Sequence, residues 1–289
     1  MNLLAYDIIL KIADLKNISR TAEYFNYTPS RISQILKATE EELGVALFYR
    51  GKFGLIPTME CISLLPALQH LLNSEKYFQE RLNCLKNIEA GTVRIGSFSS
   101  LSCHWLPQRL KAFAMVYPQI QFELKLGDCK QIADWVRSGT IDLGLIADPK
   151  ASDLTFIQLI EDSFVVILPE NHHLADCETV RYEQLQQEQF IFLEPEDNDA
   201  VEDQMRQVGF QAHVQYRVKD DYTIMALVES GLGISILPRL VLNRSSYRFR
   251  TLELSPTCIR RAGIVLQKDS YISPATQRLV DFWLQGTTE

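Results

Sequence analysis

The segment 19–44 constrains this chain more than any other stretch of its sequence. Its first residue, Ser19, fits the N-cap of a short helix over residues 20–25, which Asn26-Tyr27 then interrupts. Thr28-Pro29 fits the N-cap and first residue of a second helix, because proline lacks an N–H that would be unpaired there. The glycine that ends the segment fits the stop of this helix. Two helices joined by so short a break are typical of a helix-turn-helix unit.

One more helix and a small hairpin are predicted to flank this unit. Residues 3–15 carry apolar side chains at helical spacing, so they are predicted to bury one stripe. These side chains are Leu4, Ile8, Ile12 and Leu15. Residues 50–57 contain two glycines beside two bases, a composition that predicts a hairpin, or wing.

A long helix is predicted from its N-cap, Thr58, to about Ile88. Its large apolar residues follow a heptad seam that is broken at Glu75. They are Leu64, Leu68, Leu71, Phe78, Leu82 and Leu85. Pro66 must lie early in this helix or kink it. A heptad seam with a single polar break favours a dimerisation helix over a buried core helix.

From residue 91 the pattern changes to alternating strands and helices, which predicts a parallel α/β sheet. The elements expected in a first unit are strands at 93–96, 120–126 and 143–146 and helices at 102–117 and 128–138. Those expected in a second unit are strands at 164–168, 190–193, 214–218 and 234–237 and helices near 199–208 and 223–230. A final strand at 262–266 and a helix at 274–284 are expected to return to the first unit.

The charge of the chain is unevenly distributed. The whole chain carries a net charge of −7, which by itself argues against nucleic-acid binding. However, residues 1–58 carry a net charge of +1, and residues 151–200 hold twelve acids and a single base, Arg181. The acidity therefore belongs to the later part of the chain, and the overall charge does not describe the N-terminal region.

Composition excludes several classes of protein. No run of 18 apolar residues occurs, and the first apolar stretch is broken by charged residues, so we expect neither a membrane span nor a signal peptide. The six cysteines form no CxxC pair, so a zinc or redox motif is not expected. Without an export signal, reduced thiols in the cytoplasm are the simplest interpretation.

The segment Thr28–Arg50, TPSRISQILKATEEELGVALFYR, resembles the recognition segment of the LysR-type transcriptional regulators. Further similarities lie in Gly91-Thr92-Val93-Arg94-Ile95-Gly96, Leu106-Pro107, Asp142-Leu143-Gly144, Leu168-Pro169 and the segment 231–238, GLGISILP. Together they cover almost the whole chain. The sequence departs from the family pattern at Arg31, Gln34, Ile35 and Thr39, and at Cys61, where many members have glycine.

The resemblance implies a winged helix-turn-helix (1–58), a linker helix (59–90) and an α/β effector domain (91–289). The effector domain would consist of two Rossmann-like subdomains, as in periplasmic binding proteins. Subdomain I would comprise about 91–161 and 267–289, and subdomain II about 162–266. The implied protein is a homodimer or homotetramer in the cytoplasm that binds operator DNA and a small-molecule effector. An activator of this kind would also contact RNA polymerase.

The predicted recognition helix carries donor-rich side chains on its first turns, as reading the major groove requires. Arg31 and Gln34 are the first choices for base contacts. Phosphate contacts are expected from Thr28, Ser33 and Lys37, with Ser30 on the same face. Arg50 and Lys52 on the wing suit phosphate or minor-groove contacts. The alternative interpretation is an ordinary solvated helix face. Glu40, Glu41 and Glu42 are expected to be solvated or to face a dimer partner.

Two α/β units joined by crossing strands normally leave a ligand cleft at the carboxyl ends of their strands. The candidate effector contacts at those positions are Ser97, Ser99, Ser100, Leu101, Ile146, Ala147, Phe192, Asp221 and Thr223. An alternative role for the polar members is helix capping. Four acids near the expected mouth favour an amphipathic or aromatic effector over a multiply charged acid, namely Asp148, Glu194, Asp197 and Asp221.

Other clusters of reactive residues favour simpler roles. His172-His173 lacks a third ligand at metal spacing, which favours a surface loop over a metal site. Cys103 is more consistent with a buried thiol than with a redox switch. The arginines at 239–261 suggest a solvated face or a contact with the acidic region of another subunit. We expect no catalytic residues, metal or cofactor. The rival classes are a solute-binding protein, which would lack the N-terminal unit, and an enzyme, which would need a catalytic set.

Overall fold

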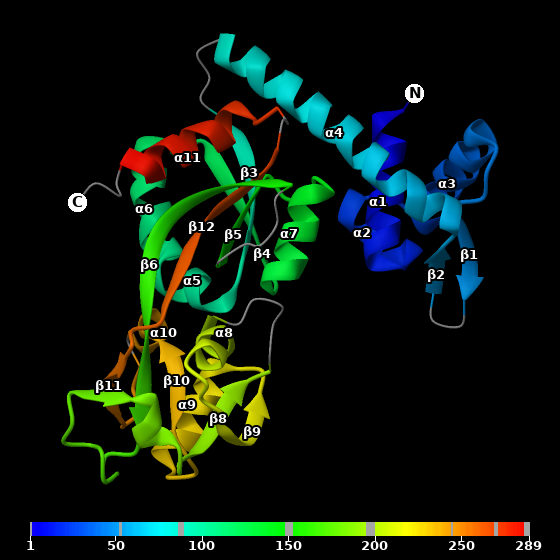
Figure 1. Cartoon of the computed structure of the whole chain (residues 1–289). Coiled ribbons are helices and arrows are strands. Elements are labelled where there is room, and N and C mark those ends of the chain that lie inside the picture. Colours follow the sequence, from blue (N-terminus) through cyan, green and yellow to red (C-terminus); the bar gives the residue numbers. More distant parts are fainter. Residues whose placement is uncertain are drawn as a thin grey trace.

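The computed structural model describes residues 2–51, 54–85, 90–147, 153–194, 200–243, 245–268 and 271–285 (Figure 1). Its N-terminal part, called the head below, is the predicted winged helix-turn-helix. The elements of the head are α1 (Leu3–Leu15), α2 (Ile18–Phe25), α3 (Pro29–Leu43), β1 (Phe48–Gly51) and β2 (Gly54–Pro57). The two strands pair antiparallel and form the wing.

Capping residues fix where the helices of the head begin and end. The Thr28 hydroxyl accepts a hydrogen bond from the Arg31 N–H at 3.2 Å, and Pro29 is the first residue of α3, as predicted. Gly44 ends the helix with a φ of 73°, a conformation that glycine adopts without strain. The predicted cap of α2 is wrong. Asn17, not Ser19, caps this helix, since its side-chain oxygen accepts from the Arg20 N–H at 3.0 Å.

The apolar stripe of α1 is shifted from the prediction. Ile8 and Ile12 are fully buried, but the stripe continues through Ala5 and Ile9, and Leu4 is exposed. The core of the head is completed from the other helices and the wing. It includes Ala22, Ile32, Leu36, Leu47, Cys61 and Leu68. One apolar cluster therefore joins the head to the start of the next helix.

Helix α4 (Met59–Leu85) connects the head to the rest of the chain (Figure 1). Thr58 caps it as predicted, accepting from the Cys61 N–H at 3.0 Å. The predicted heptad seam divides between two environments: Leu68 is buried against the head, whereas Phe78 and Leu85 are exposed. The exposed apolar side chains are those a partner helix would cover.

An α/β region of two subdomains follows. Its first elements are β3 (Gly91–Ser97), α5 (Ser99–His104), α6 (Leu106–Val116), β4 (Ile120–Leu126), α7 (Cys129–Arg137), β5 (Leu143–Ala147) and β6 (Leu154–Leu168). The middle elements are β7 (Thr179–Arg181), the 3-10 helix η1 (Tyr182–Leu185), β8 (Gln189–Leu193), α8 (Ala200–Gln207), β9 (His213–Val218) and α9 (Asp221–Glu229). The last are β10 (Ser235–Pro238), α10 (Arg239–Leu242), β11 (Arg250–Ser255), β12 (Ile259–Gln267) and α11 (Pro274–Gln285).

The first subdomain has the predicted parallel sheet. Strand β3 pairs parallel with both β4 and β5, and β12 adds an antiparallel strand beside β5. Helices α6 and α11 cover one face and α7 covers the other (Figure 1). The single helix predicted at 102–117 is wrong. It is broken at Trp105, since Pro107 has no N–H to donate to the Cys103 carbonyl, as a continuous helix requires.

Strands β6 and β12 cross between the subdomains. They pair antiparallel along the whole of β12 and the first part of β6, from Leu154 opposite Gln267 to Ser163 opposite Ile259. Strand β6 therefore begins ten residues earlier than the strand predicted at 164–168. Beyond the crossing, β10 and β11 pair with the end of β6 and form the second subdomain with β7, α9 and the parallel pair β8–β9. The expected fold class is confirmed.

Candidate DNA-binding surface and effector site

Helix α3 separates its polar and apolar side chains onto different faces. Ile32, Leu36 and Thr39 are buried, and Thr39 fills the position where the family pattern has leucine. The predicted contact residues are all exposed, namely Thr28, Ser30, Arg31, Ser33, Gln34 and Lys37. The head therefore presents the hydroxyl, amide, guanidinium and ammonium groups of one helix to solvent. Such a set can donate to base edges and phosphates.

The wing is held against α3 by a carboxylate. Glu40 Oε1 accepts hydrogen bonds from the N–H groups of Leu47 at 2.7 Å and Phe48 at 3.2 Å. The prediction for Glu40 is therefore wrong: this side chain positions the wing instead of being solvated or facing a partner. Arg50 is exposed on β1, as its predicted role requires, whereas Lys52 lies outside the described residues.

The predicted effector residues near α5 differ in accessibility. Ser97 is buried, and its hydroxyl donates to the Phe98 carbonyl at 3.3 Å. Ser99 is exposed at the first position of α5, whose N-cap, Phe98, makes no side-chain capping bond. Ser100 is buried and accepts a hydrogen bond from the Arg260 guanidinium at 3.0 Å. Ser99 and Ser100 therefore lie at the end of β3, where α5 approaches the crossing strands.

A buried ion pair ties these crossing strands to both subdomains. Arg260 on β12 binds Asp162 on β6 through Nε at 2.9 Å and Nη2 at 2.7 Å. The other oxygen of Asp162 accepts from the N–H of Leu240, in α10, at 3.0 Å. The guanidinium also lies 5.4 Å from the ring centre of Phe98. Through Ser100 and Leu240, this pair contacts α5 of one subdomain and α10 of the other.

The interpretation of the arginine-rich stretch is corrected for Arg260, which is buried against Asp162 instead of lying on a solvated face or contacting another subunit. Arg261 is 59% exposed and pairs with Glu161 at 3.3 Å, which agrees with the solvated face. Both acids belong to the region 151–200 of the same chain. They lie on opposite faces of one β-strand pair, because successive side chains in a strand alternate.

A second contact joins the subdomains near the start of α9. The Tyr222 hydroxyl lies 3.5 Å from His104 Nε2 in α5, and burial raises the pKa of this tyrosine. The N-cap of α9 is Asp220, not Asp221. Asp220 accepts from both the N–H and the hydroxyl of Thr223, at 2.8 and 2.9 Å. Thr223 therefore takes part in the cap as a donor to Asp220, and its side chain is exposed.

Three other predicted effector residues are packed into the core. Leu101 belongs to the cluster between β3 and α11, Ile146 to the cluster under α7, and Phe192 to that of the second subdomain. In this arrangement their side chains do not form a wall of the interface. Ala147 is partly buried at the end of β5. Asp148 and Asp197, expected near the mouth, lie outside the described residues.

Arg260, Asp162, His104 and Tyr222 were not among the predicted site residues. A usable signal existed for Arg260, since it shares a strand face with Ala262, Ile264 and Leu266, all of which are buried. The same alternation places Asp162 in line with buried Phe164. No local pattern distinguishes His104 and Tyr222, because their contact joins residues 118 positions apart.

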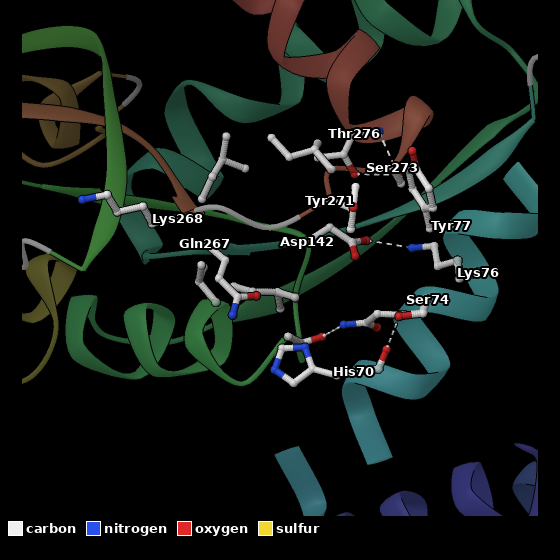
Figure 2. Close-up of a pocket in the computed structure, with 16 residues that line it drawn as sticks. His70, Ser74, Lys76, Tyr77, Asp142, Gln267, Lys268, Tyr271, Ser273 and Thr276 are labelled. Atoms are coloured by element: carbon white, nitrogen blue, oxygen red, sulfur yellow. Dashed lines mark hydrogen bonds and ion pairs between the residues drawn. The ribbon is translucent and has the colours of Figure 1, made fainter. Parts of the chain in front are cut away.

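A cavity of about 450 Å³ lies apart from the interface described above, between α4, the start of α11 and the turn after α7 (Figure 2). None of the predicted effector residues lines it. Its walls include His70, Lys76 and Tyr77 of α4 and Tyr271 and Thr276 near α11.

A polar network docks α4 onto the first subdomain beside this cavity. Asp142 binds Lys76 at 2.8 Å (Figure 2). It also binds Arg94 at 2.6 Å. Asn73 donates to the Gly139 carbonyl and accepts from Arg94, both at 2.9 Å. Burial acts to raise the pKa of Asp142, but the hydrogen bond and charge of Arg94, with Lys76, hold it below its ordinary value. The end of the linker helix is thereby fixed to the effector region.

Comparison with known proteins matches both parts of the chain to one family. The description "Bacterial regulatory helix-turn-helix protein, lysR family" fits residues 3–61, and "LysR substrate binding domain" fits residues 86–287. The chain is 31% identical over 241 residues to the probable HTH-type transcriptional regulator LrrA of Synechococcus elongatus. This match covers 83% of this chain and 82% of LrrA.

Solved structures share the fold. CbnR complexed with its target DNA has a TM-score of 0.72 at 17% identity, over 99% of both chains. The effector-binding domain of QuiR in complex with shikimate has a TM-score of 0.63 at 24% identity, over 68% of this chain and 97% of that domain. Within the described residues, no helix is long and apolar enough to cross a membrane. The chain belongs to the LysR family of DNA-binding transcriptional regulators, which have an effector-binding domain and are not enzymes.

Proposed function

We propose that this protein recognises a specific operator sequence through α3 and that a small molecule bound between the two α/β subdomains controls it. The observation that carries the DNA-binding half is the exposed donor face of α3 above a fully buried apolar face. The likeness to CbnR, solved with its target DNA, supports the same role for the head.

Individual roles follow from side-chain chemistry. Arg31 and Gln34 would contact base edges, because guanidinium and amide groups form paired hydrogen bonds with guanine and adenine. Thr28, Ser33 and Lys37 would bind phosphates, with Ser30 beside them. Arg50 and Lys52 of the wing would add phosphate or minor-groove contacts. The head has a net charge of only +1, so paired heads in an oligomer would supply the affinity.

Operator binding by variants of the full chain tests these roles. Arg31→Ala is expected to reduce discrimination between operator and random DNA, costing about 1–3 kcal/mol on the operator alone. Arg50→Ala should weaken binding to both DNAs alike and lower the salt dependence. Lys111→Ala, an exposed base on α6, is the control and should change neither. Equal losses on both DNAs in the Arg31 variant would refute its role in sequence recognition.

The effector would bind where α5 faces α9 and the crossing strands. Ser99 and Thr223 offer exposed hydroxyls there, while the hydroxyl of buried Ser100 is bonded to Arg260. The likeness to the QuiR domain solved with shikimate supports a small polar ligand. Arg260 is already neutralised by Asp162, which does not favour a multiply charged anion. We therefore propose a compact amphipathic or aromatic effector with hydroxyl or single carboxylate groups.

Control would work through the angle between the subdomains. The contacts of Arg260 with Ser100 and of Tyr222 with His104 join the subdomains in this arrangement. An effector that binds one arrangement more tightly than another would shift the equilibrium between them. Because α4 is docked on the first subdomain, that shift would change the spacing of paired heads.

Thermal-shift titration of the full chain against a set of hydroxylated and aromatic acids tests the effector proposal. A saturating rise in melting temperature is expected for one such compound, and Thr223→Val and Ser99→Ala should weaken it. Thr251→Val, an exposed threonine on β11, is the matched control. Tight binding of citrate instead, or a response unchanged by Thr223→Val and Ser99→Ala, would contradict the proposed chemistry or site.

The remaining expectations follow from this function. We propose residues 1–58, 59–90 and 91–289 as the head, linker and effector domains, with dimerisation through the exposed seam of α4. The two subdomains would comprise about 91–161 with 267–289, and 162–266. A regulator that binds operator DNA would act in the cytoplasm, and an activating mode would add a contact with RNA polymerase.

A further inference from the structure

Two loops of the second subdomain bring together two imidazoles and a carboxylate. His172 and His173 follow β6, and Glu188 precedes β8. His172 Nε2 lies 3.1 Å from Glu188 Oε2, and His173 Nε2 lies 3.5 Å from Glu188 Oε1. One potential ligand atom from each residue lies within 4.8 Å of the others. The third ligand, missing from the local sequence, is thus supplied from 16 positions away.

The cluster is held by its surroundings. The side chains of His172 and Glu188 are only 13% and 16% exposed, whereas that of His173 is 67% exposed. The His172 N–H donates to the Pro169 carbonyl at 3.0 Å, and the Glu188 N–H donates to the Leu185 carbonyl at 3.1 Å. Two ligands are therefore fixed by main-chain turns, and the third closes the site from the solvent side.

We propose that His172, His173 and Glu188 bind a divalent transition-metal ion of the zinc class. Imidazole nitrogens and a carboxylate are ligands that Zn²⁺, Ni²⁺ and Co²⁺ accept, and a set of three leaves a coordination position for water. The ion would join the loop after β6 to the loop before β8. It lies in a part of the second subdomain separate from the effector interface, so the proposal does not depend on the function proposed above.

The proton positions define what binding must change. The Leu174 N–H donates to His172 Nδ1 at 3.3 Å, which places the ring proton on Nε2, facing Glu188. A metal ion on Nε2 requires the other neutral tautomer, so the ring proton moves from Nε2 to Nδ1 and the long bond from Leu174 is given up.

Calorimetric titration of the tag-free, EDTA-treated full chain with Zn²⁺ tests the site. In a second experiment, the visible absorption of bound Co²⁺ reports whether its ligands are nitrogen and oxygen atoms. We expect one saturable equivalent and a rise in melting temperature on binding. His173→Ala should weaken binding at least about tenfold, the loss seen even for groups that only orient a ligand. This residue is mostly exposed, so its removal leaves the fold intact.

Two comparisons complete the test. Glu188→Gln should weaken binding as His173→Ala does, whereas His70→Ala, an exposed histidine on α4, should leave binding unchanged. Absence of a saturable equivalent in the parent chain would overturn the proposal and leave Glu188 as a simple hydrogen-bonding partner of the two histidines. Full retention of affinity in His173→Ala or Glu188→Gln would overturn it equally.

Discussion

Replacing Asp162 by asparagine is expected to destabilise the junction of the two subdomains strongly. The Asp162 side chain is 6% exposed and that of Arg260 is 11% exposed. Asparagine keeps an oxygen that can accept from the Leu240 N–H, but it removes the charge that compensates the guanidinium. The variant therefore leaves a buried cation whose remaining protein hydrogen bond is to the Ser100 hydroxyl.

The size of the effect follows from burial. Removing one partner of a buried ion pair costs about 3–5 kcal/mol, because the other charge remains out of water. With a urea m value of about 2 kcal/mol/M, the unfolding midpoint would fall by about 1.5–2.5 M. The matched control is Arg261→Met on the same strand. Its pair with Glu161 is 59% and 53% exposed, so the loss should be at most about 1 kcal/mol.

Tryptophan emission during urea unfolding of the full chain is a suitable assay. All three tryptophans, Trp105, Trp135 and Trp283, lie in the first subdomain. A double-mutant cycle with Arg260→Met isolates the interaction, and the double variant should lose much less than the sum of the single ones. A loss below about 1 kcal/mol for Asp162→Asn, or an additive cycle, would refute this account of the junction.

Two further predictions concern other groups. Cys103 is exposed, so the buried thiol expected from the sequence is wrong. Iodoacetamide at pH 8 should label Cys103 first and Cys61 only on unfolding, because burial, with the charge of Glu40, raises the pKa of Cys61 to about 11. Peptide mass spectrometry would check this order, and early labelling of Cys61 would contradict it. Asp142 has a lowered pKa in the folded chain, so its stabilising contribution is present above about pH 3.8, its unfolded pKa, and is lost as pH falls through the folded pKa. The difference in unfolding free energy between the parent and Asp142→Asn should thus shrink on acidification, and a constant difference would contradict the assigned cause.

Local signals predicted much of the fold. Helix α3 begins at Thr28-Pro29 and ends at Gly44, as expected, because capping and backbone preferences act within a few residues. Signals that depend on distant partners were less informative. The length of β6 is set by its pairing with β12 about one hundred residues later, and the start of α2 by which of two nearby polar residues caps it.

The candidate sites show the same division. Amphipathic spacing was enough to place Arg31, Gln34 and Lys37 on the exposed face of α3. A position just after a strand did not by itself distinguish Ser99, which is exposed, from Leu101, which packs into the core. That choice depends on how α5 turns against β3 and α11.

The sequence by itself determined the family, the winged head, the linker helix and the parallel α/β pattern, since these follow from periodicity, caps and a long motif. Only the tertiary structure decided which charges meet. It paired Arg260 with Asp162 across 98 positions and brought Glu188 to His172 and His173. Such contacts join residues far apart in the chain, and their energies depend on burial, which no local pattern of residue types specifies.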